Sequence, residues 1–160
     1  MLLNADKINA LLRTKAGKPA QVGVDLTVKE IKLIHGGRLY KNETKLHDYT
    51  PATLSIDDEG REGWWLSPNQ AYSVTFEQGI ELDNLHAGMI THRSSLLRMG
   101  WSCMSGIYDP GFAVDEMGAV IKGNTYIFVE KGARIAQIII HECHSSTLYD
   151  GQWQKEKDVK

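Results

Sequence analysis

Residues 22–28 read Val-Gly-Val-Asp-Leu-Thr-Val, so that apolar side chains alternate with glycine, aspartate and threonine. Alternation with a period of two is typical of a β-strand that has one face in a core. Similar short segments recur along the chain, and sequences rich in Gly, Asn, Asp and Pro separate them. The further strands expected from this pattern cover residues 53–56, 63–66, 71–76, 86–92, 119–121, 125–129 and 134–141.

Many short strands at this spacing favour an all-β fold, a distorted jelly roll or barrel, over an α/β fold with crossover helices. One short helix is expected at the start, where Asn4 can cap a segment whose apolar residues Ile8, Leu11 and Leu12 share a face. No internal repeat or linker is visible. We therefore predict a single domain over residues 1–160, with residues 145–160 as a mobile C-terminal tail.

Composition and charge exclude several classes of protein. The chain has 160 residues, of which 42% are hydrophobic and 24% are charged, which is ordinary for one globular domain. The net charge of -2 is too acidic for a general nucleic-acid coat protein, so we expect no direct nucleic-acid binding. The apolar runs are too short to span a bilayer, and no signal-peptide stretch is visible, so no membrane contact is expected. Two cysteines are consistent with a cytoplasmic location.

Two polar motifs lie in the first two-thirds of the chain. Asp25 lies two residues after Gly23 at the start of its strand and can reach a ligand or a water molecule on a metal ion. The alternative is a solvent-facing carboxylate on an alternating strand. Residues 91–100 contain two arginines and two serines, which are suitable donors for phosphate oxygens. The alternative here is a polar turn that leads into a short helix.

Two further motifs follow. In residues 105–112, Asp109 precedes a Pro-Gly turn, where a rigid carboxylate can orient and deprotonate an attacking water. The alternative is a plain Asp-Pro-Gly turn. Residues 132–137 place Arg134 and Gln137 on a strand after a glycine turn. Gln137 can hydrogen-bond a triphosphate or a neighbouring loop, although the strand can also serve the core alone.

Metal and nucleotide motifs of other kinds are weak or missing. Residues 141–144 read His-Glu-Cys-His, but no paired spacing elsewhere completes a zinc site. The zinc-deaminase signature, the P-loop and the dinucleotide glycine fingerprint are absent from the sequence.

Taken in order, the four motifs resemble those of the dUTPase and dCTP deaminase superfamily, whose members are homotrimeric enzymes built on a distorted jelly roll or β-barrel of the β-clip kind. The resemblance covers nearly the whole chain. It implies a homotrimer with sites at subunit interfaces, a deoxynucleoside triphosphate as substrate, and Mg²⁺ carried mainly by that substrate.

The resemblance also implies a role for each motif residue. Asp109 would be the general base, and Asp25 would hold the water shell of Mg²⁺. Phe112 would pack against the deoxyribose, and Gly106 would leave room for a water above the base. The other implied substrate-binding residues are Arg134, together with Arg93, Ser94, Ser95, Arg98 and Gln137 at the phosphates, and Trp153 and Gln154 closing over the site from a neighbouring subunit.

Several features distinguish the two branches of the superfamily, and one departure from the deaminase pattern matters most. The N-terminal helix, Arg98, residues 109–112 and the tail at residues 149–154 resemble the deaminases. However, the position of the deaminases' catalytic glutamate falls on Ala119 or a direct neighbour, and none of these can transfer a proton. Glu116 lies three residues earlier, which on a regular strand is the opposite face.

We therefore expect hydrolysis of dUTP to dUMP and pyrophosphate. The first alternative is a dCTP deaminase in which another residue replaces the glutamate. The second is a non-catalytic protein that binds a nucleotide or a protein partner. The sequence does not identify the base.

Overall fold

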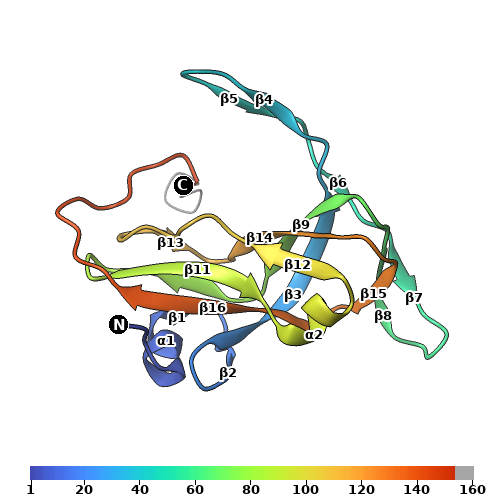
Figure 1. Ribbon diagram of the computed structural model, residues 1–160, viewed down its shortest axis with the longest axis horizontal. Coiled ribbons are helices and arrows are strands. Elements are labelled where there is room, and N and C mark those ends of the chain that lie inside the picture. Colours follow the sequence, from blue (N-terminus) through green and yellow to red (C-terminus); the bar gives the residue numbers. More distant parts are fainter. Residues whose placement is uncertain (154–160) are drawn as a thin grey trace.

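A computed structural model describes residues 1–153 of the chain as strands joined by short loops, with two short helices (Figure 1). The helices are α1 (Ala5–Leu11) and α2 (Ser94–Arg98). The strands are β1 (Leu12–Arg13), β2 (Lys18–Pro19), β3 (Val24–Leu33), β4 (Gly37–Leu39), β5 (Thr44–Leu46), β6 (Thr50–Pro51), β7 (Leu54–Ile56), β8 (Glu62–Leu66), β9 (Ala71–Phe76), β10 (Gly79–Glu81), β11 (His86–His92), β12 (Trp101–Met104), β13 (Ala113–Val114), β14 (Gly118–Gly123), β15 (Ile127–Glu130) and β16 (Arg134–Glu142).

Six strands close into an antiparallel barrel. Around the barrel the order is β16, β11, β12, β14, β9 and β3, and the pairing of β3 with β16 completes the ring. Alternate side chains of these strands fill the interior, as the period-two pattern predicts. Fully buried examples are Val24, Leu26, Val74, Phe76, Ile121, Ile138 and Ile140. The closed barrel confirms the predicted all-β fold class.

Smaller sheets surround the barrel. One consists of β15, β8 and β7, and another of β1, β10 and β13. The hairpin of β4 and β5 extends away from the rest of the molecule (Figure 1), and every one of its strand residues is exposed. Leu39 on this hairpin is 86% exposed. The hairpin therefore contributes little to the core.

The predicted helix is present, and the side chain of Asn4 accepts a hydrogen bond from the backbone N–H of Lys7 at its N-terminus. Strands β9 and β11 have the predicted bounds, whereas β3 continues to Leu33 rather than ending near residue 28. Strand β12 and the β4–β5 hairpin were not predicted, because neither contains a long run of alternating apolar residues. Within residues 1–153, no helix has the length and apolar character needed to cross a membrane.

Candidate active site

Asp25 is the centre of a charged cluster on the outer face of the barrel. Strand β3 places it opposite Gln137 of β16, and the Gln137 side chain donates to Asp25 Oδ1 at 2.8 Å. Two guanidinium groups contact the other carboxylate oxygen: Arg134 Nη1 lies 2.9 Å and Arg93 Nε lies 3.1 Å from Asp25 Oδ2. Asp25 is only 3% exposed. The structure thus brings together members of the first, second and fourth sequence motifs.

A backbone irregularity makes this cluster possible. Residues that lie three apart on a regular strand point to opposite faces. The register of β16 against β3 shifts between Arg134 and Ala136, as in a β-bulge, so that the side chains of Arg134 and Gln137 both reach Asp25. The backbone N–H of Arg93 donates to the carbonyl of Ile135 at 2.9 Å, which fixes the end of β11 beside the bulge.

The cluster is cationic and retains free hydrogen-bond donors. Two guanidinium groups and one carboxylate leave a net charge of about +1. Arg93 Nη1 donates to the carbonyl oxygen of Arg134 at 3.1 Å, yet the side chains of Arg93 and Arg134 remain 29% and 35% exposed. Ser94, Ser95 and Arg98 follow on α2 and are exposed. Fixed guanidinium groups with free N–H donors are suited to binding the oxygens of an anion such as phosphate.

The loop at residues 105–112 forms a second, separate region. Tyr108 and Gly88 of β11 exchange two backbone hydrogen bonds, at 2.7 and 2.9 Å. The Tyr108 ring stacks on Phe112 with centroids 4.9 Å apart, and its hydroxyl donates to the Gly118 carbonyl at 2.6 Å. Burial raises the pKa of Tyr108 well above its usual value, so its hydroxyl stays a neutral donor. This anchor was not anticipated from the sequence.

Asp109 lies next to this anchor and is exposed. Its carbonyl accepts a hydrogen bond from the Phe112 N–H at 3.0 Å, and Gly111 has a φ of +87°, which completes a tight turn. A side chain at Gly106 would meet no atom within 4 Å, so the space beside the loop is open. The loop therefore holds its backbone rigidly while the Asp109 carboxylate faces outward.

The C-terminal segment packs onto the same loop. The backbone N–H of Tyr149 donates to the Pro110 carbonyl at 2.7 Å, and the Tyr149 ring meets Phe112 edge-on at 5.2 Å. The backbone N–H of Trp153 lies 3.3 Å from the Tyr149 hydroxyl, and Trp153 is 46% exposed. Gln154 lies outside the described residues. The closing of this segment over a site in a neighbouring subunit stays a prediction.

The two regions lie toward opposite ends of β11. Gly88 pairs with Tyr108 toward one end, whereas Arg93 directly follows the other end. At about 3.3 Å per residue, Gly88 and Arg93 are on the order of 17 Å apart along the strand. Within a single chain the Tyr108 anchor is therefore set apart from Arg93, although the resemblance assigns Asp109 and the Asp25 cluster to one site.

The residues of the described part do not form a metal cage. Among residues 1–153 no group of three or more His, Cys, Asp and Glu residues is placed to bind a metal ion. Both Asp25 oxygens already accept hydrogen bonds from cationic or amide donors, which does not fit direct coordination of a cation. A Mg²⁺ ion bound to a triphosphate needs few protein ligands, so Mg²⁺ and its contact with Asp25 stay predictions.

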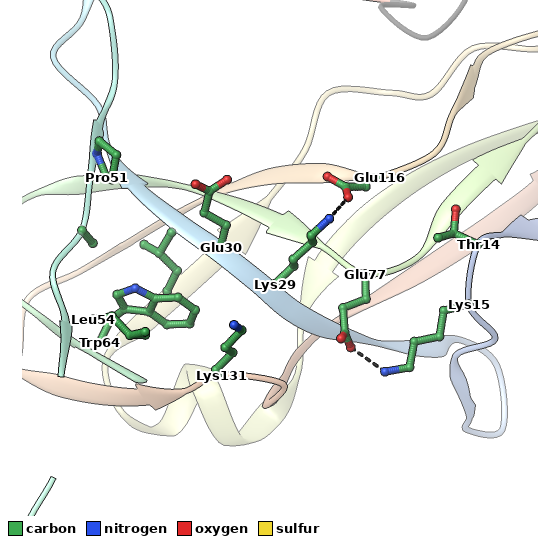
Figure 2. A pocket seen from close by; sticks show the side chains of 12 residues that line it. Thr14, Lys15, Lys29, Glu30, Pro51, Leu54, Trp64, Glu77, Glu116 and Lys131 are labelled. Atoms are coloured by element: carbon green, nitrogen blue, oxygen red, sulfur yellow. Dashed lines mark hydrogen bonds and ion pairs between the residues drawn. The ribbon is translucent and has the colours of Figure 1, made fainter. Parts of the chain in front are cut away.

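A large cavity of about 780 Å³ lies elsewhere (Figure 2). Lys15 pairs with Glu77 at 2.6 Å on its wall, and Lys29 pairs with Glu116. The Glu116 carboxylate raises the pKa of Lys29. None of the predicted site residues lines this cavity. Glu116 is thus engaged away from the Asp109 loop.

The chain combines a closed barrel with a cationic cluster at the β3–β16 seam, and its sequence matches a known family. A family model described as dCTP deaminase-like matches residues 3–143. The chain therefore belongs to the dCTP deaminase-like family, which confirms the resemblance seen in its motifs.

Two relatives are named as dUTP hydrolases. The deoxyuridine 5'-triphosphate nucleotidohydrolase of Methanocaldococcus jannaschii is 33% identical over 82% of this chain and 83% of its own length. A probable deoxyuridine 5'-triphosphate nucleotidohydrolase of Halobacterium salinarum is 26% identical over 84% of this chain and 82% of its own length.

Solved structures of low sequence identity share the fold. The dCTP deaminase of Agrobacterium tumefaciens has a TM-score of 0.66 at 15% identity, covering 89% of this chain but only 48% of that chain. The dUTPase of Staphylococcus bacteriophage 80alpha has a TM-score of 0.55 at 15% identity, covering 88% of this chain and 95% of that chain.

Proposed function

We propose that this protein is a dUTP diphosphohydrolase, which converts dUTP and water to dUMP and pyrophosphate. The observation that carries the proposal is the absence of a carboxylate on β14, which reads Gly-Ala-Val-Ile-Lys-Gly over Gly118–Gly123. A glutamate on this strand would be expected for deamination, and Glu116 is instead paired with Lys29. Relatives named as dUTP nucleotidohydrolases support the same choice.

In the proposed reaction Asp109 is the general base. Its exposed carboxylate takes a proton from a water molecule, and the water oxygen forms a bond to the α-phosphorus of the substrate. The bond from this phosphorus to the oxygen that bridges to the β-phosphate breaks, and pyrophosphate leaves. Phe112 and the open space at Gly106 lie on the side of the deoxyribose and the base.

The phosphate groups bind at the charged cluster. Arg93, Arg134 and Gln137 offer donors that the barrel already holds in place, and Ser94, Ser95 and Arg98 lie on the adjoining helix. Positioning and neutralisation of charge account for most of the catalysis in phosphoryl chemistry. Mg²⁺ bound to the triphosphate would supply further neutralisation of its charge.

We further propose a homotrimer in which each site combines two chains. The separation of Asp109 from the Asp25 cluster within one chain supports this arrangement, because a triphosphate bound at the cluster of one chain can meet Asp109 of another. The two cysteines of the sequence, Cys103 and Cys143, are both free. Free thiols suit the reducing cytoplasm, where we propose that the enzyme works.

A panel of dNTPs with Mg²⁺ tests the proposed activity. Pyrophosphate and ammonia are measured separately for each nucleotide. We expect pyrophosphate from dUTP at a higher kcat/KM than from the other dNTPs, and no ammonia from dCTP. Release of ammonia from dCTP would assign the protein to the deaminases. Tight nucleotide binding with no pyrophosphate would identify a binding protein.

A further inference from the structure

Asp25 makes contacts that give it a role different from metal binding. We infer that Asp25 is a positioning residue, which aligns Arg93 and Arg134 so that their outer N–H groups form a preformed cradle for a triphosphate. The inference rests on the proposed function only for the identity of the nucleotide, since the cradle would bind any chain of three phosphates.

Three of the roughly four acceptor sites of the Asp25 carboxylate are occupied by donors of its own chain. Its Oδ2 atom accepts from both guanidinium groups, at 2.9 and 3.1 Å, and Oδ1 accepts from the Gln137 amide at 2.8 Å. The Asp25 side chain is only 5% exposed, and a carboxylate buried to this extent requires such partners, because an unpaired buried charge is costly. A contact with the water shell of Mg²⁺ would have to use the remaining acceptor site of Oδ1, at a residue that is only 3% exposed.

The arginines gain a fixed geometry from Asp25. Two guanidinium groups repel each other and lose rotamer freedom when they are held at one place, and the shared carboxylate oxygen offsets both costs. Arg93 is fixed twice, through Nε to Asp25 and through Nη1 to the carbonyl of Arg134. The Nη2 groups of both arginines have no partner within residues 1–153, and the two side chains are about one-third exposed. These groups are therefore available to phosphate oxygens.

The net charge of the cluster also favours the binding of a triphosphate over the binding of a free metal ion. At about +1 it attracts a polyanion and repels a free divalent cation, since both guanidinium groups lie within hydrogen-bond distance of the only carboxylate. Removing the carboxylate would raise the charge to about +2. Simple charge arithmetic then predicts tighter binding of an anion, whereas loss of the arginine alignment predicts weaker binding. The direction of the change in anion affinity therefore distinguishes a purely electrostatic effect of Asp25 from a positioning role.

The experiment measures the binding of inorganic tripolyphosphate in EDTA by calorimetry, for the full-length parent protein and for Asp25→Asn. We expect the substitution to weaken binding by roughly tenfold or more, the size of one lost charge-assisted hydrogen bond. The matched control is Glu77→Gln, which removes a carboxylate that is bonded to Lys15 outside the cluster. The control should bind tripolyphosphate as the parent protein does.

A second readout separates positioning from metal binding. We expect the Mg²⁺ concentration for half-maximal dUTP turnover to stay unchanged in Asp25→Asn, while the KM for dUTP rises more than kcat falls. If Asp25→Asn does not fold by circular dichroism, Asp25→Glu serves in its place. It keeps the charge but displaces the anchoring oxygens, and it should weaken tripolyphosphate binding in EDTA as well.

Unchanged or tighter tripolyphosphate binding in the Asp25 variants would overturn the inference, and so would a raised Mg²⁺ requirement with unchanged binding in EDTA. Failure of the parent protein to bind tripolyphosphate would also overturn it. A parent protein that binds tripolyphosphate but does not hydrolyse dUTP would contradict the proposed function alone, so that the two failures are distinguishable.

Discussion

Asp25 and Asp109 are both carboxylates of the proposed site, but their surroundings are opposite. Asp25 is buried between strands, and both of its oxygens are bonded to side chains of β16 and the end of β11. Asp109 is exposed on a loop whose rigidity comes from aromatic packing and backbone hydrogen bonds. The comparison shows how environment sets role: the first carboxylate is committed to holding cations, whereas the second is free to accept a proton.

The largest expected effect is at Asp109. Asp109→Asn keeps the size of the side chain but removes the proton acceptor, so kcat for dUTP should fall by roughly 10²–10⁴. The affinity for tripolyphosphate should change little, because the Asp25 cluster lies elsewhere on the chain. Steady-state assays of pyrophosphate release and calorimetry measure the two quantities. A variant that released pyrophosphate as fast as the parent protein would show that Asp109 is not the general base.

The proposed site has two halves, the Asp109 loop and the Asp25 cluster. Mixing two inactive variants tests whether these halves come from different chains. Asp109→Asn lacks the base, and Arg93→Ala lacks a phosphate donor. If each site takes one half from each of two chains, random assembly of an equal mixture leaves about a quarter of the sites intact. Activity near that fraction is expected after the two proteins are dissociated and reassembled together. Each variant reassembled alone is the control. A mixture as inactive as its components would place both halves in one chain.

Substitution of Tyr108 should have a smaller effect on stability and kcat, which is confined to the loop that carries Asp109. Tyr108→Phe keeps the ring stack on Phe112 but removes the hydroxyl that bonds the Gly118 backbone. The free energy of unfolding should fall by about 0.5–1.5 kcal/mol, and kcat should fall several-fold as Asp109 becomes less well placed. Tripolyphosphate binding should not change. Denaturant titration and kinetics measure these effects, and weaker tripolyphosphate binding would show that the halves are coupled within one chain.

The smallest effect is expected on the projecting hairpin. Leu39→Ser changes a side chain that is 86% exposed on β4, and the β4–β5 hairpin extends away from the barrel (Figure 1). The free energy of unfolding should shift by less than about 0.5 kcal/mol, and kcat/KM for dUTP should equal that of the parent protein. Denaturant titration and pyrophosphate assays provide the comparison. A clear loss in kcat/KM would mean that the hairpin contributes to the site of the assembled enzyme.

The residue types of both halves were predictable from the sequence, but their contacts were not. Arginines, serines and a carboxylate in ordered motifs predicted phosphate chemistry. The alternative of a solvent-facing Asp25 also remained open, because burial of an outer-face residue depends on side chains from other strands. Arg134 reaches Asp25 only through the β-bulge, and a bulge depends on the pairing of residues that lie 107 or more positions apart in sequence. The local sequence pattern contains no information about such long-range strand pairing.

The fold was predictable where apolar residues alternate and unpredictable where they do not. Strands β9 and β11 lie half in the core, so their period-two pattern was clear. The hairpin of β4 and β5 has no buried face, and its strands therefore carry no such pattern. The anchoring of Tyr108 at Gly118 was likewise missed, because it joins a loop to a strand through a single hydroxyl.

The seam that closes the barrel joins an early strand, β3, to the last one, β16, and it is also the seam that holds Asp25, Arg134 and Gln137. During synthesis the chain emerges from its N-terminus, so Asp25 leaves the ribosome long before its partners do. Until β16 follows, the growing chain has an open sheet edge and an unpaired carboxylate on it. The proposed binding of a triphosphate should therefore arise only after β16 has been synthesised, together with the closed barrel itself.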